Sequence, residues 1–536
     1  MNKNSIVYTT EIEKFYYSPI VNLGYGIHSN DDFINLYVFI GKSNDFGESI
    51  EPPEINLTTN EVKSVLKNII ALKKANLNDI SPIIERIDWT ANNFYYYYDS
   101  SVNFGIKGSD DKLIKPFYVR NRFDQVFKCL WNNSNSYDSY SISNIANNST
   151  HYTVTHEGGT FGIGSLITID TVNPSAYNGT FKIVGSAVGT ANVICAFDEK
   201  YAMSANGYSS GGRIKSANLT VEEPVLSTGN FDSENIVKTS DGYKWKYLYT
   251  IDKGAKLKFF DNDWMPVPIN NLTKYPYSSN VGWGSIDVVN VVDGGNGYTN
   301  GTNTVTILVN GDGSGFSAEA FVSNNVIQDI TVLEKGYDYT YADIVVAASQ
   351  GYSGTGAELV LSISPIGGHK FNLIQELYCK NISISVPFEQ ELFSKNFYFN
   401  QVGILYNPYV KTNISTHANS SFISCTTDLL VTSLGNPFTE GELVYQGNSL
   451  EDFNFRANVL SFDSANNFLS LINTYGTPVE NFEIFGTESN SVKIIQQVIP
   501  SVYVPNSGDL FYVENRLDEL RDTIGSQQIR LMINYN

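Results

Sequence analysis

The stretch FNQVGILYNPYV, Phe399 to Val410, carries the strand signal from which the fold can be worked out. Apolar and polar residues alternate along it until Asn407-Pro408 interrupts the pattern. A period of two residues predicts a half-buried strand, and an Asn-Pro pair predicts the turn that ends it. Phe399, Ile404, Asn407 and Pro408 are therefore candidates for core or interface contacts.

Two distant segments are predicted to pair with this strand. One is GYKWKYLYTI, Gly242 to Ile251, and the other is the ending, Gly508 to Asn536, which contains GDLFYVENR and QQIRLMINYN. The alternation in the first segment places four aromatic residues on one face, namely Tyr243, Trp245, Tyr247 and Tyr249. Because none of the three stretches holds a nucleophile, a metal-ligand cluster or a phosphate loop, we interpret them as packing surface.

The length, net charge and composition of the chain limit the classes of function that it can have. The chain has 536 residues, enough for about three or four domains, and a net charge of −20 without a cluster of basic residues. An acidic surface repels phosphate backbones, so no nucleic-acid partner is expected. No apolar run reaches the roughly 20 residues that cross a bilayer, and the first residues lack the apolar block of a secretion signal. The 35 Tyr and 31 Phe favour strands over helices.

Cysteine and histidine spacing gives no sign of a metal or a cofactor. The cysteines are single, and the five histidines lie far apart in the sequence without HxxxH, HExxH or HxH spacing. Buried free thiols are expected at four positions: Cys129, Cys195, Cys379 and Cys425. The glycine-rich stretch from Asn310 to Ala320 precedes a strand pattern rather than a helix, so its glycines are predicted to form a turn and no phosphate cradle.

One amphipathic surface helix is predicted near residues 59–75. Thr58 and Glu61 have capping-box spacing, and apolar residues follow at helical intervals up to Leu72. The aromatic run FYYYY, Phe94 to Tyr98, allows two interpretations. It is either an exposed contact platform or a strand with alternate rings in the core.

Three composition shifts mark small β modules at residues 132–225, 283–365 and 427–500. The middle module contains an internal repeat, because Ile286 to Thr299 aligns with Ile327 to Thr340 at a spacing of 41 residues. The glycine pairs Gly313/Gly315 and Gly354/Gly356 recur at the same spacing. Two copies of a strand-turn-strand unit are therefore expected to pack together, since neither is expected to bury its apolar face alone.

The remaining landmarks appear in a fixed order: NLYVFIGKS, ERIDW, VFKCL, GYKWKYLYTI, WMPVP, FNQVGILYNP and GDLFYVENR. This order resembles the baseplate wedge protein of T-even-like contractile-tailed bacteriophages, the product of gene eight. Where that family has F-G-R-S, this chain has Ile40 to Ser43, and where it has R-D-W, an extra residue makes Arg86-Ile87-Asp88-Trp89. The family's G-Y-x-W-x-Y-L-F resembles Gly242 to Tyr249, its I-x-x-x-N-P resembles Ile404 to Pro408, and its G-x-x-x-Y-x-E-N-R resembles Gly508 to Arg516.

The resemblance implies a mainly β, multi-domain protein with a β-sandwich-like core. That core would comprise residues 1–131, 226–282, 366–426 and 501–536, with the three β modules as insertions. The family's members are structural and not enzymes: they form a homodimer in each wedge, bind other baseplate wedge proteins and help transmit the contraction trigger. Expected contact residues from the last motif are Tyr512, Glu514, Asn515 and Arg516.

The expected location is the virion tail baseplate, after synthesis in the bacterial cytoplasm. No cofactor, membrane or small-molecule substrate is expected. Two other hypotheses remain open. The chain could be a fibre-like adhesin that binds host surface glycans through its inserted β modules. It could also be a polysaccharide-degrading enzyme, which would need a pair of carboxylates in a cleft.

Overall fold

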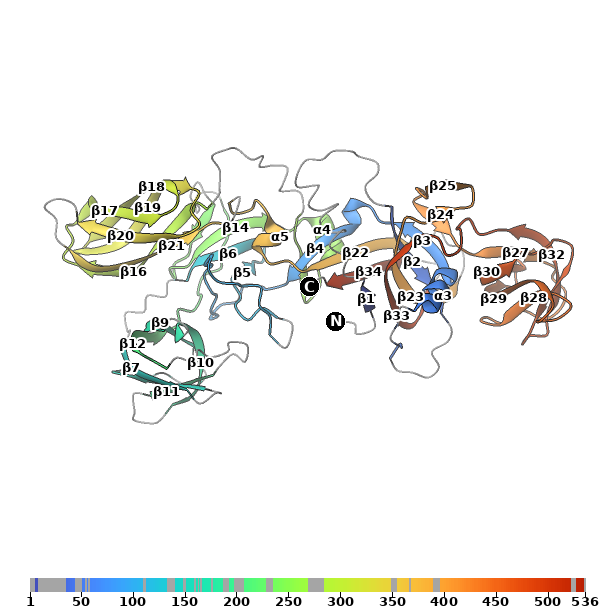
Figure 1. The fold of residues 1–536 in the computed structure, drawn as a ribbon, viewed down its shortest axis with the longest axis horizontal. Coiled ribbons are helices and arrows are strands. Elements are labelled where there is room, and N and C mark those ends of the chain that lie inside the picture. The colour runs from blue at the N-terminus through green and yellow to red at the C-terminus, as the bar shows by residue number, and fades with distance from the viewer. Residues whose placement is uncertain are drawn as a thin grey trace. The chain divides into compact units, whose positions relative to one another are not determined.

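The computed structural model of the chain is built mainly from strands, which make up 57% of it, against 6% helix. This confirms the prediction of a mainly β, multi-domain protein (Figure 1). The structure describes residues 5–7, 35–43, 51–53, 55, 58–108, 112–132, 140–147, 151–158, 161, 163, 166–174, 177–186, 192–196, 207–227, 235–268, 284–348, 354–365, 368–388, 396–521 and 527–534.

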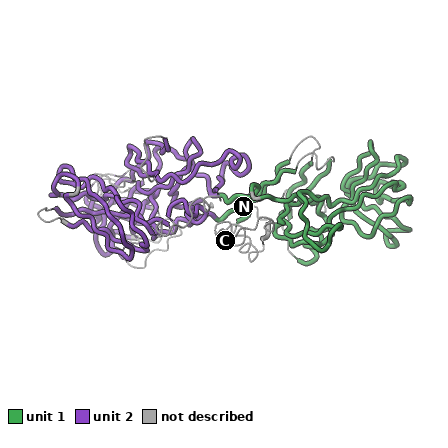
Figure 2. Tube along the Cα trace, turned by 90° about the horizontal axis from the view of Figure 1, so that it is seen from above, with its two compact units in different colours: residues 1–83, 380–536 green, residues 84–379 purple. Residues whose placement is uncertain are grey.

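The chain divides into two compact units, coloured separately in Figure 2. Unit 1 comprises residues 1–83 and 380–536, and unit 2 comprises residues 84–379. The four segments that the sequence groups into one core are therefore shared between the two units. Segments 1–131 and 366–426 each cross the boundary, 226–282 lies in unit 2, and 501–536 lies in unit 1.

A six-stranded antiparallel sheet forms the centre of unit 1. Its strands, in spatial order, are β1 (Ser5–Val7), β33 (Asp509–Arg521), β23 (Phe397–Tyr406), β2 (Leu36–Gly41), β3 (Ile69–Lys74) and β26 (Phe422–Ser424). The strand predicted at Phe399 is thus β23, and it ends at Tyr406, because Asn407 has a positive φ of 51°. The expected pairing of this strand with the chain's ending is confirmed for β33, where Ile404 lies opposite Tyr512.

Two details of the central strand differ from expectation. Its second neighbour is β2 and not the segment Gly242 to Ile251, which lies in unit 2. The strand is also buried on both faces rather than half-buried, since only Tyr398 and Tyr406, near its two ends, are exposed. Gly403 is at the tightest point: a Cβ there would lie 2.3 Å from the carbonyl oxygen of Tyr512 and 2.5 Å from the ring of Phe39.

The predicted amphipathic helix forms, but it is shorter than expected. Helix α3 (Thr59–Lys67) buries Val65 and Leu66, and Asn68 is its C-cap. Residues Ile69 to Lys74, predicted as the helix's second half, instead form strand β3 between β2 and β26. Residues 69–72 are all buried, which one face of a surface helix does not allow.

The capping box of α3 gives a first prediction. The Thr58 hydroxyl accepts from the backbone N–H of Glu61, and the Glu61 carboxylate accepts from the backbone N–H of Thr58. Thr58→Ala removes this N-cap, so it should lower helix stability by about 0.5–2 kcal/mol and speed amide hydrogen exchange across residues 59–67. Lys63→Ala, at an exposed position of the same helix, is the control. Equal exchange rates in the two variants would contradict the capping role.

Unit 1 also contains most of a further sheet, a closed barrel and a short hairpin. In this sheet, β22 (Asn381–Phe388) pairs on one side with β4 (Ile80–Glu85) and on the other with β34 (Gln527–Asn534). The closed barrel lies within residues 427–500. Its strands are β27 (Thr427–Val431), β30 (Phe468–Gly476), β29 (Phe453–Asp463), β28 (Leu443–Gly447), β31 (Glu483–Gly486) and β32 (Val492–Ile499). A short hairpin, β24 (Tyr409–Val410) with β25 (Asn413–His417), follows the central strand.

Unit 2 is organised around a four-stranded sheet whose two faces have different cores. The strands are β13 (Ile236–Lys238), β14 (Lys244–Thr250), β6 (Gln125–Trp131) and β5 (Tyr118–Arg120). Tyr243 and Trp245 pack on one face with Tyr247 beside them. Tyr249, predicted on that same face, belongs to the core of the other face, because a bulge between Tyr247 and Tyr249 shifts the alternation.

The aromatic run Phe94 to Tyr98 borders this sheet and is mostly buried. Tyr95 contacts the ring of Trp245 edge-on, Tyr97 lies 5.2 Å from Trp131 between ring centroids, and Tyr98 packs in the core near Phe104. The core interpretation holds for Phe94, Tyr95 and Tyr98, but the run forms no strand and its burial does not alternate, because Tyr96 and Tyr97 are both half-buried. Of the predicted buried thiols, Cys129, Cys195 and Cys379 are buried, whereas Cys425 is only half-buried.

Residues 140–216 form a second closed barrel. Its strands are β10 (Gly179–Ser186), β11 (Asn192–Ala196), β8 (His151–His156), β7 (Tyr140–Asn147), β12 (Ser210–Ser216) and β9 (Leu166–Asn173). Its interior is a separate apolar cluster that includes Val154, Ile167 and Ile214.

The repeat module has one core shared by both copies. Its strands are β16 (Ile286–Asn296), β17 (Gly301–Gly311), β18 (Ser314–Ser323), β19 (Val326–Tyr337), β20 (Ala342–Ala348) and β21 (Thr355–Ile363). The predicted glycine turn is the connection between β17 and β18.

The two copies of the repeat depend on each other. The N–H of Tyr298 donates to Asn325, and 41 residues later the N–H of Tyr339 donates to Gly284. A Cβ at Gly354 would lie 2.2 Å from the ring of Tyr298, so a glycine of the second copy makes room for a tyrosine of the first. The expectation that neither copy buries its apolar face alone is met by this exchange.

Candidate functional site: two charged networks and a buried motif core

The predicted contact residues fall into two groups, one in each unit. In unit 1, Phe399, Ile404, Tyr512, Glu514 and Asn515 are buried on β23 and β33. In unit 2, Tyr243 and Trp245 are buried and Tyr247 is half-buried. These side chains are therefore occupied by packing within the chain.

Polar residues of the last motif form a connected set on β33. The Tyr512 hydroxyl donates to Glu514 at 2.5 Å, and Arg516 Nε donates to the other oxygen of the same carboxylate at 2.6 Å. Asn515 accepts from the Gln401 side chain on β23 and donates to the Pro53 carbonyl. The turn after β23 is held in a similar way, because the N–H of Asn407 donates to Asn35 and Pro408 accepts from Ala418.

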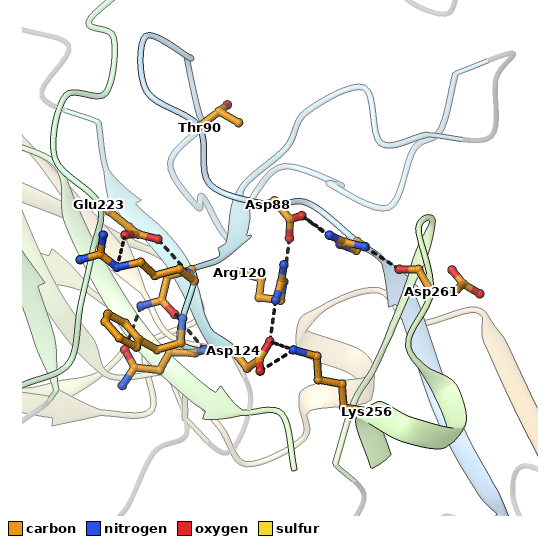
Figure 3. Close-up of polar contacts among 12 residues, drawn as sticks. Asp88, Thr90, Arg120, Asp124, Glu223, Lys256 and Asp261 are labelled. Carbon is orange, nitrogen blue, oxygen red and sulfur yellow. Dashed lines mark hydrogen bonds and ion pairs between the residues drawn. The ribbon is translucent and has the colours of Figure 1, made fainter. Parts of the chain in front are cut away.

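In unit 2, the Arg86–Trp89 motif opens the first charged network, which Figure 3 shows around Arg120. Asp88 pairs with Arg86 and with Arg120, each at 2.6 Å. Arg120 also reaches Asp124 at 2.5 Å, and Asp124 accepts from Lys256 of helix α4 (Lys253–Phe259) at 2.7 Å. A chain of ion pairs between alternating basic and acidic side chains therefore links three segments that are distant in the sequence.

An aromatic ring lies beneath the same cations. The guanidinium carbons of Arg86 and Arg120 lie 4.6 and 4.8 Å from the centroid of the Phe260 ring, and Lys256 Nζ lies 5.2 Å from it. Cations at such distances are attracted to the ring face. Sequence reasoning identified Arg86 and Asp88 as a motif but missed Arg120, Asp124, Lys256 and Phe260, which nothing in the local pattern connects.

The pKa values of the two carboxylates in this network are shifted. Partial burial alone would raise the pKa of Asp124, but its hydrogen bonds to Lys256 and Arg120 hold the pKa below its ordinary value. The pKa of Asp88 is lowered in the same way by Arg120 and Arg86, against its partial burial. A carboxyl with a lower pKa in the fold stabilises the fold above its unfolded pKa of about 3.9, and this contribution is lost as the pH falls.

Asp124→Asn tests the network without disturbing the backbone. Asp124 has a φ of 59°, a conformation that Asn also tolerates, so the substitution keeps the backbone while it removes the negative charge and one of the two acceptor oxygens. We expect the free energy of unfolding at pH 7 to fall by about 1–2 kcal/mol. We also expect the variant to lose less of its free energy of unfolding than the wild type when the pH is lowered from about 5 to about 2. Urea unfolding followed by tryptophan fluorescence measures this, because all five tryptophans lie within residues 84–379. An unchanged pH dependence would contradict the assignment.

The second network is buried under the central sheet of unit 2. Lys128 Nζ, on β6, donates to Glu376 Oε1 at 2.9 Å, and both side chains are at most 1% exposed. His369 lies between two carboxylates, with Nδ1 2.5 Å from Glu376 and Nε2 3.4 Å from Asp287. Lys335 pairs with Asp287 at 3.0 Å. The sequence signal was a lysine inside the apolar run VFKCL.

The pKa values in this network are set by burial and by the neighbouring charges. Burial lowers the pKa of His369, and Lys128 lowers it further, whereas Glu376 and Asp287 oppose the shift. Burial also lowers the pKa of Lys128, although Glu376 opposes this. It would raise the pKa of Glu376, but Lys128 and His369 together hold that pKa far below its ordinary value. Glu376 also borders a pocket of about 590 Å³ lined by Tyr98, Tyr339 and Tyr378.

Other carboxylates of unit 2 hold local structure. Asp261 accepts from the backbone N–H groups of Asp263 and Trp264, and Glu223 pairs with Arg122. Within the described ranges, no group of three His, Cys, Asp or Glu side chains is arranged to hold a metal ion. None of the helices in the described part of the chain has the length and apolar character to span a bilayer.

Comparison with protein-family models and with curated protein sequences finds no match to this chain.

Proposed function

We propose that this chain is a structural subunit of the baseplate wedge of a contractile phage tail. There it would form a homodimer, bridge neighbouring wedge proteins and help transmit the contraction trigger. The observation that carries the proposal is the ordered series of motifs from NLYVFIGKS to GDLFYVENR. Three of them, on β2, β23 and β33, are adjacent strands of one sheet although the sequence separates the outer two by more than 450 residues.

The ion pairs among the described residues suit a structural role. Several buried or half-buried charged side chains are held in ion pairs, such as Lys128 with Glu376 and Arg120 with Asp88. Networks of this kind fix the positions of distant segments and give a rigid scaffold. A wedge subunit has to keep its shape while its neighbours rearrange, so rigid sheets and barrels joined by such networks support the proposal.

A surface on unit 1 is suited to the dimer. Tyr398 on β23 lies opposite Leu520 on β33, and Leu517 lies three residues before Leu520 on the same strand. Leu517 and Leu520 are 56% and 50% exposed. Exposed apolar side chains grouped on a sheet mark an association surface.

Light scattering of the purified full chain at micromolar concentration tests the dimer. We expect twice the 59.5-kDa mass of one chain for the wild type, and the single-chain mass for Leu517→Glu/Leu520→Glu. Leu434→Glu, at a position that is 78% exposed on the barrel of residues 427–500, is the control and should remain dimeric. A wild-type protein with the mass of one chain would count against the proposal.

One observation favours the second candidate, a fibre-like adhesin that binds host glycans. An aromatic-lined pocket in unit 2 is bordered by residues of two of the three β modules. Carboxylates also line this pocket. A polysaccharide-degrading enzyme would need a pair of carboxylates in a cleft, so this hypothesis is partly supported as well. If changes to the pocket abolished adsorption of the phage to its host, the adhesin function would replace the wedge function.

A further inference from the structure

A pocket of about 420 Å³ lies in unit 2 where three parts of the chain meet. The aromatic run and Trp131 form one wall, barrel strands β9 and β10 form another, and β16 and β21 of the repeat module form the third. The Tyr96 hydroxyl donates to the Thr180 carbonyl at 3.4 Å and so joins the first wall to the second. The volume is within the range of small-molecule sites, about 300–1,000 Å³.

Two pairs of aromatic rings line this pocket. Phe94 and Tyr96 meet edge to face, with centroids 5.1 Å apart, and Tyr97 is tilted against Trp131 at 5.2 Å. Each ring is held by its partner, so together they form a rigid apolar wall. Such a wall suits a ligand that presents C–H groups on one side, as the faces of sugar rings do.

Polar groups on the other walls are free to bind a ligand. Asn132 is 2% exposed and lines the pocket; its amide nitrogen donates to the Tyr95 carbonyl, but its Oδ1 has no hydrogen-bond partner among the described residues. A buried acceptor left in this state costs free energy unless a ligand or water satisfies it. The side chain of Glu358, on β21 at the pocket, makes no hydrogen bond or ion pair with a described residue, while its backbone pairs with β16. Both groups accept hydrogen bonds, which a ligand with hydroxyl donors would supply.

The charged residues that line the pocket limit the class of ligand that can bind there. Three carboxylates border the pocket, Asp99, Asp170 and Glu358, against one lysine, Lys115. Lys215 of β12 pairs with Asp170 at 2.7 Å, whereas the pocket walls and Asp170 raise the pKa of Glu358. An excess of negative charge disfavours phosphate, sulfate and uronic acid groups.

We propose that this pocket binds one or two units of a neutral or amino sugar. The aromatic rings would pack against the sugar's C–H face, while Glu358 would accept from its hydroxyl groups. This ligand goes beyond the wedge function and the expectation that the chain takes no small-molecule substrate, and it deepens the second candidate function by naming the class of sugar and the residues that would bind it. Sugar binding does not require the dimer, so the two proposals fail independently.

Saturation-transfer NMR on the full chain tests the inference with four probes: lactose, maltotriose, glucosamine and, as the anionic comparison, glucuronic acid. We expect transfer to at least one of the first three and none to glucuronic acid. Glu358→Ala and Tyr96→Ala should each weaken that binding by at least about tenfold, the effect of a lost hydrogen bond to a charged group or of a lost ring contact.

Matched controls come from the same module. Glu334→Ala and Tyr341→Ala remove an exposed carboxylate and an exposed ring away from the pocket and should bind like the wild type. Circular dichroism and the unfolding midpoint check that each variant is folded. The inference is overturned if none of the first three probes binds, or if folded Glu358→Ala and Tyr96→Ala variants bind as the wild type does. Cleavage of maltotriose would support the site and contradict the non-enzymatic function.

Discussion

Replacing Lys128 with methionine is expected to lower the free energy of unfolding of unit 2 by about 3–5 kcal/mol. Lys128 and Glu376 are almost completely buried and 2.9 Å apart. Without the ammonium group, the Glu376 carboxylate stays buried with only His369 and the backbone N–H of Lys370 to compensate its charge. Tryptophan fluorescence in urea measures the loss, because every tryptophan lies within residues 84–379.

Two further variants separate this effect from a general loss of charge. Lys238→Met removes an ion pair with Asp329 in which the side chains are 57% and 40% exposed, and should cost no more than about 1 kcal/mol. Lys128→Met/Glu376→Met removes both members of the buried pair and should cost less than the sum of the two single changes. The account would be wrong if Lys128→Met destabilised the protein no more than Lys238→Met does.

The second large effect is expected for Trp245→Ala, at about 3–5 kcal/mol. The Trp245 side chain is fully buried, stacks on the Tyr243 ring with centroids 5.4 Å apart and meets Tyr95 edge-on at 5.6 Å. Removing the indole leaves a large cavity between β14 and the aromatic run, which the surrounding rings fill only in part. The remaining four tryptophans report the unfolding of unit 2.

Leu257→Ala is the matched control for this substitution. Leu257 is 81% exposed on helix α4 of the same unit, so its truncation should change stability by less than about 0.5 kcal/mol. If Trp245→Ala instead left stability intact and changed only the mass of the assembly, Trp245 would be an interface residue and its burial in the core would have to be reconsidered.

The central sheet of unit 1 shows what local sequence patterns can predict and what they cannot. The alternation in FNQVGILY predicted a strand at Phe399, and Asn407-Pro408 predicted its end, because both signals are local. The neighbours of that strand were only half predictable. β14 and β33 have equally good strand patterns, and only the packing of the whole chain assigns β33 to the sheet of β23 and β14 to another unit.

Helix α3 shows how one pattern can fit two structures. Val62, Val65, Leu66, Ile69 and Leu72 recur at helical spacing, so the sequence favours a helix through Leu72. The helix ends after Lys67 because Ile69 and the residues after it pair with β2, where apolar side chains can be buried on both faces. A buried strand and a helical stripe are indistinguishable over so few residues.

The charged networks were the least predictable feature. Arg86 and Asp88 are two residues apart, so a shared face could be expected from the sequence. Lys128 and Glu376, by contrast, are separated by 248 residues, and their pairing requires the fold itself. A lysine in an apolar run signals a buried partner, but it does not identify that partner.

The most direct test of the wedge proposal is an electron cryomicroscopy reconstruction of the tail of the phage that encodes this chain. The account predicts density for the two units in the baseplate, with two copies of the chain in each wedge contacting other wedge proteins. Intact tails in which this chain is missing from the baseplate, or is found only in fibres that reach toward the host, would contradict it.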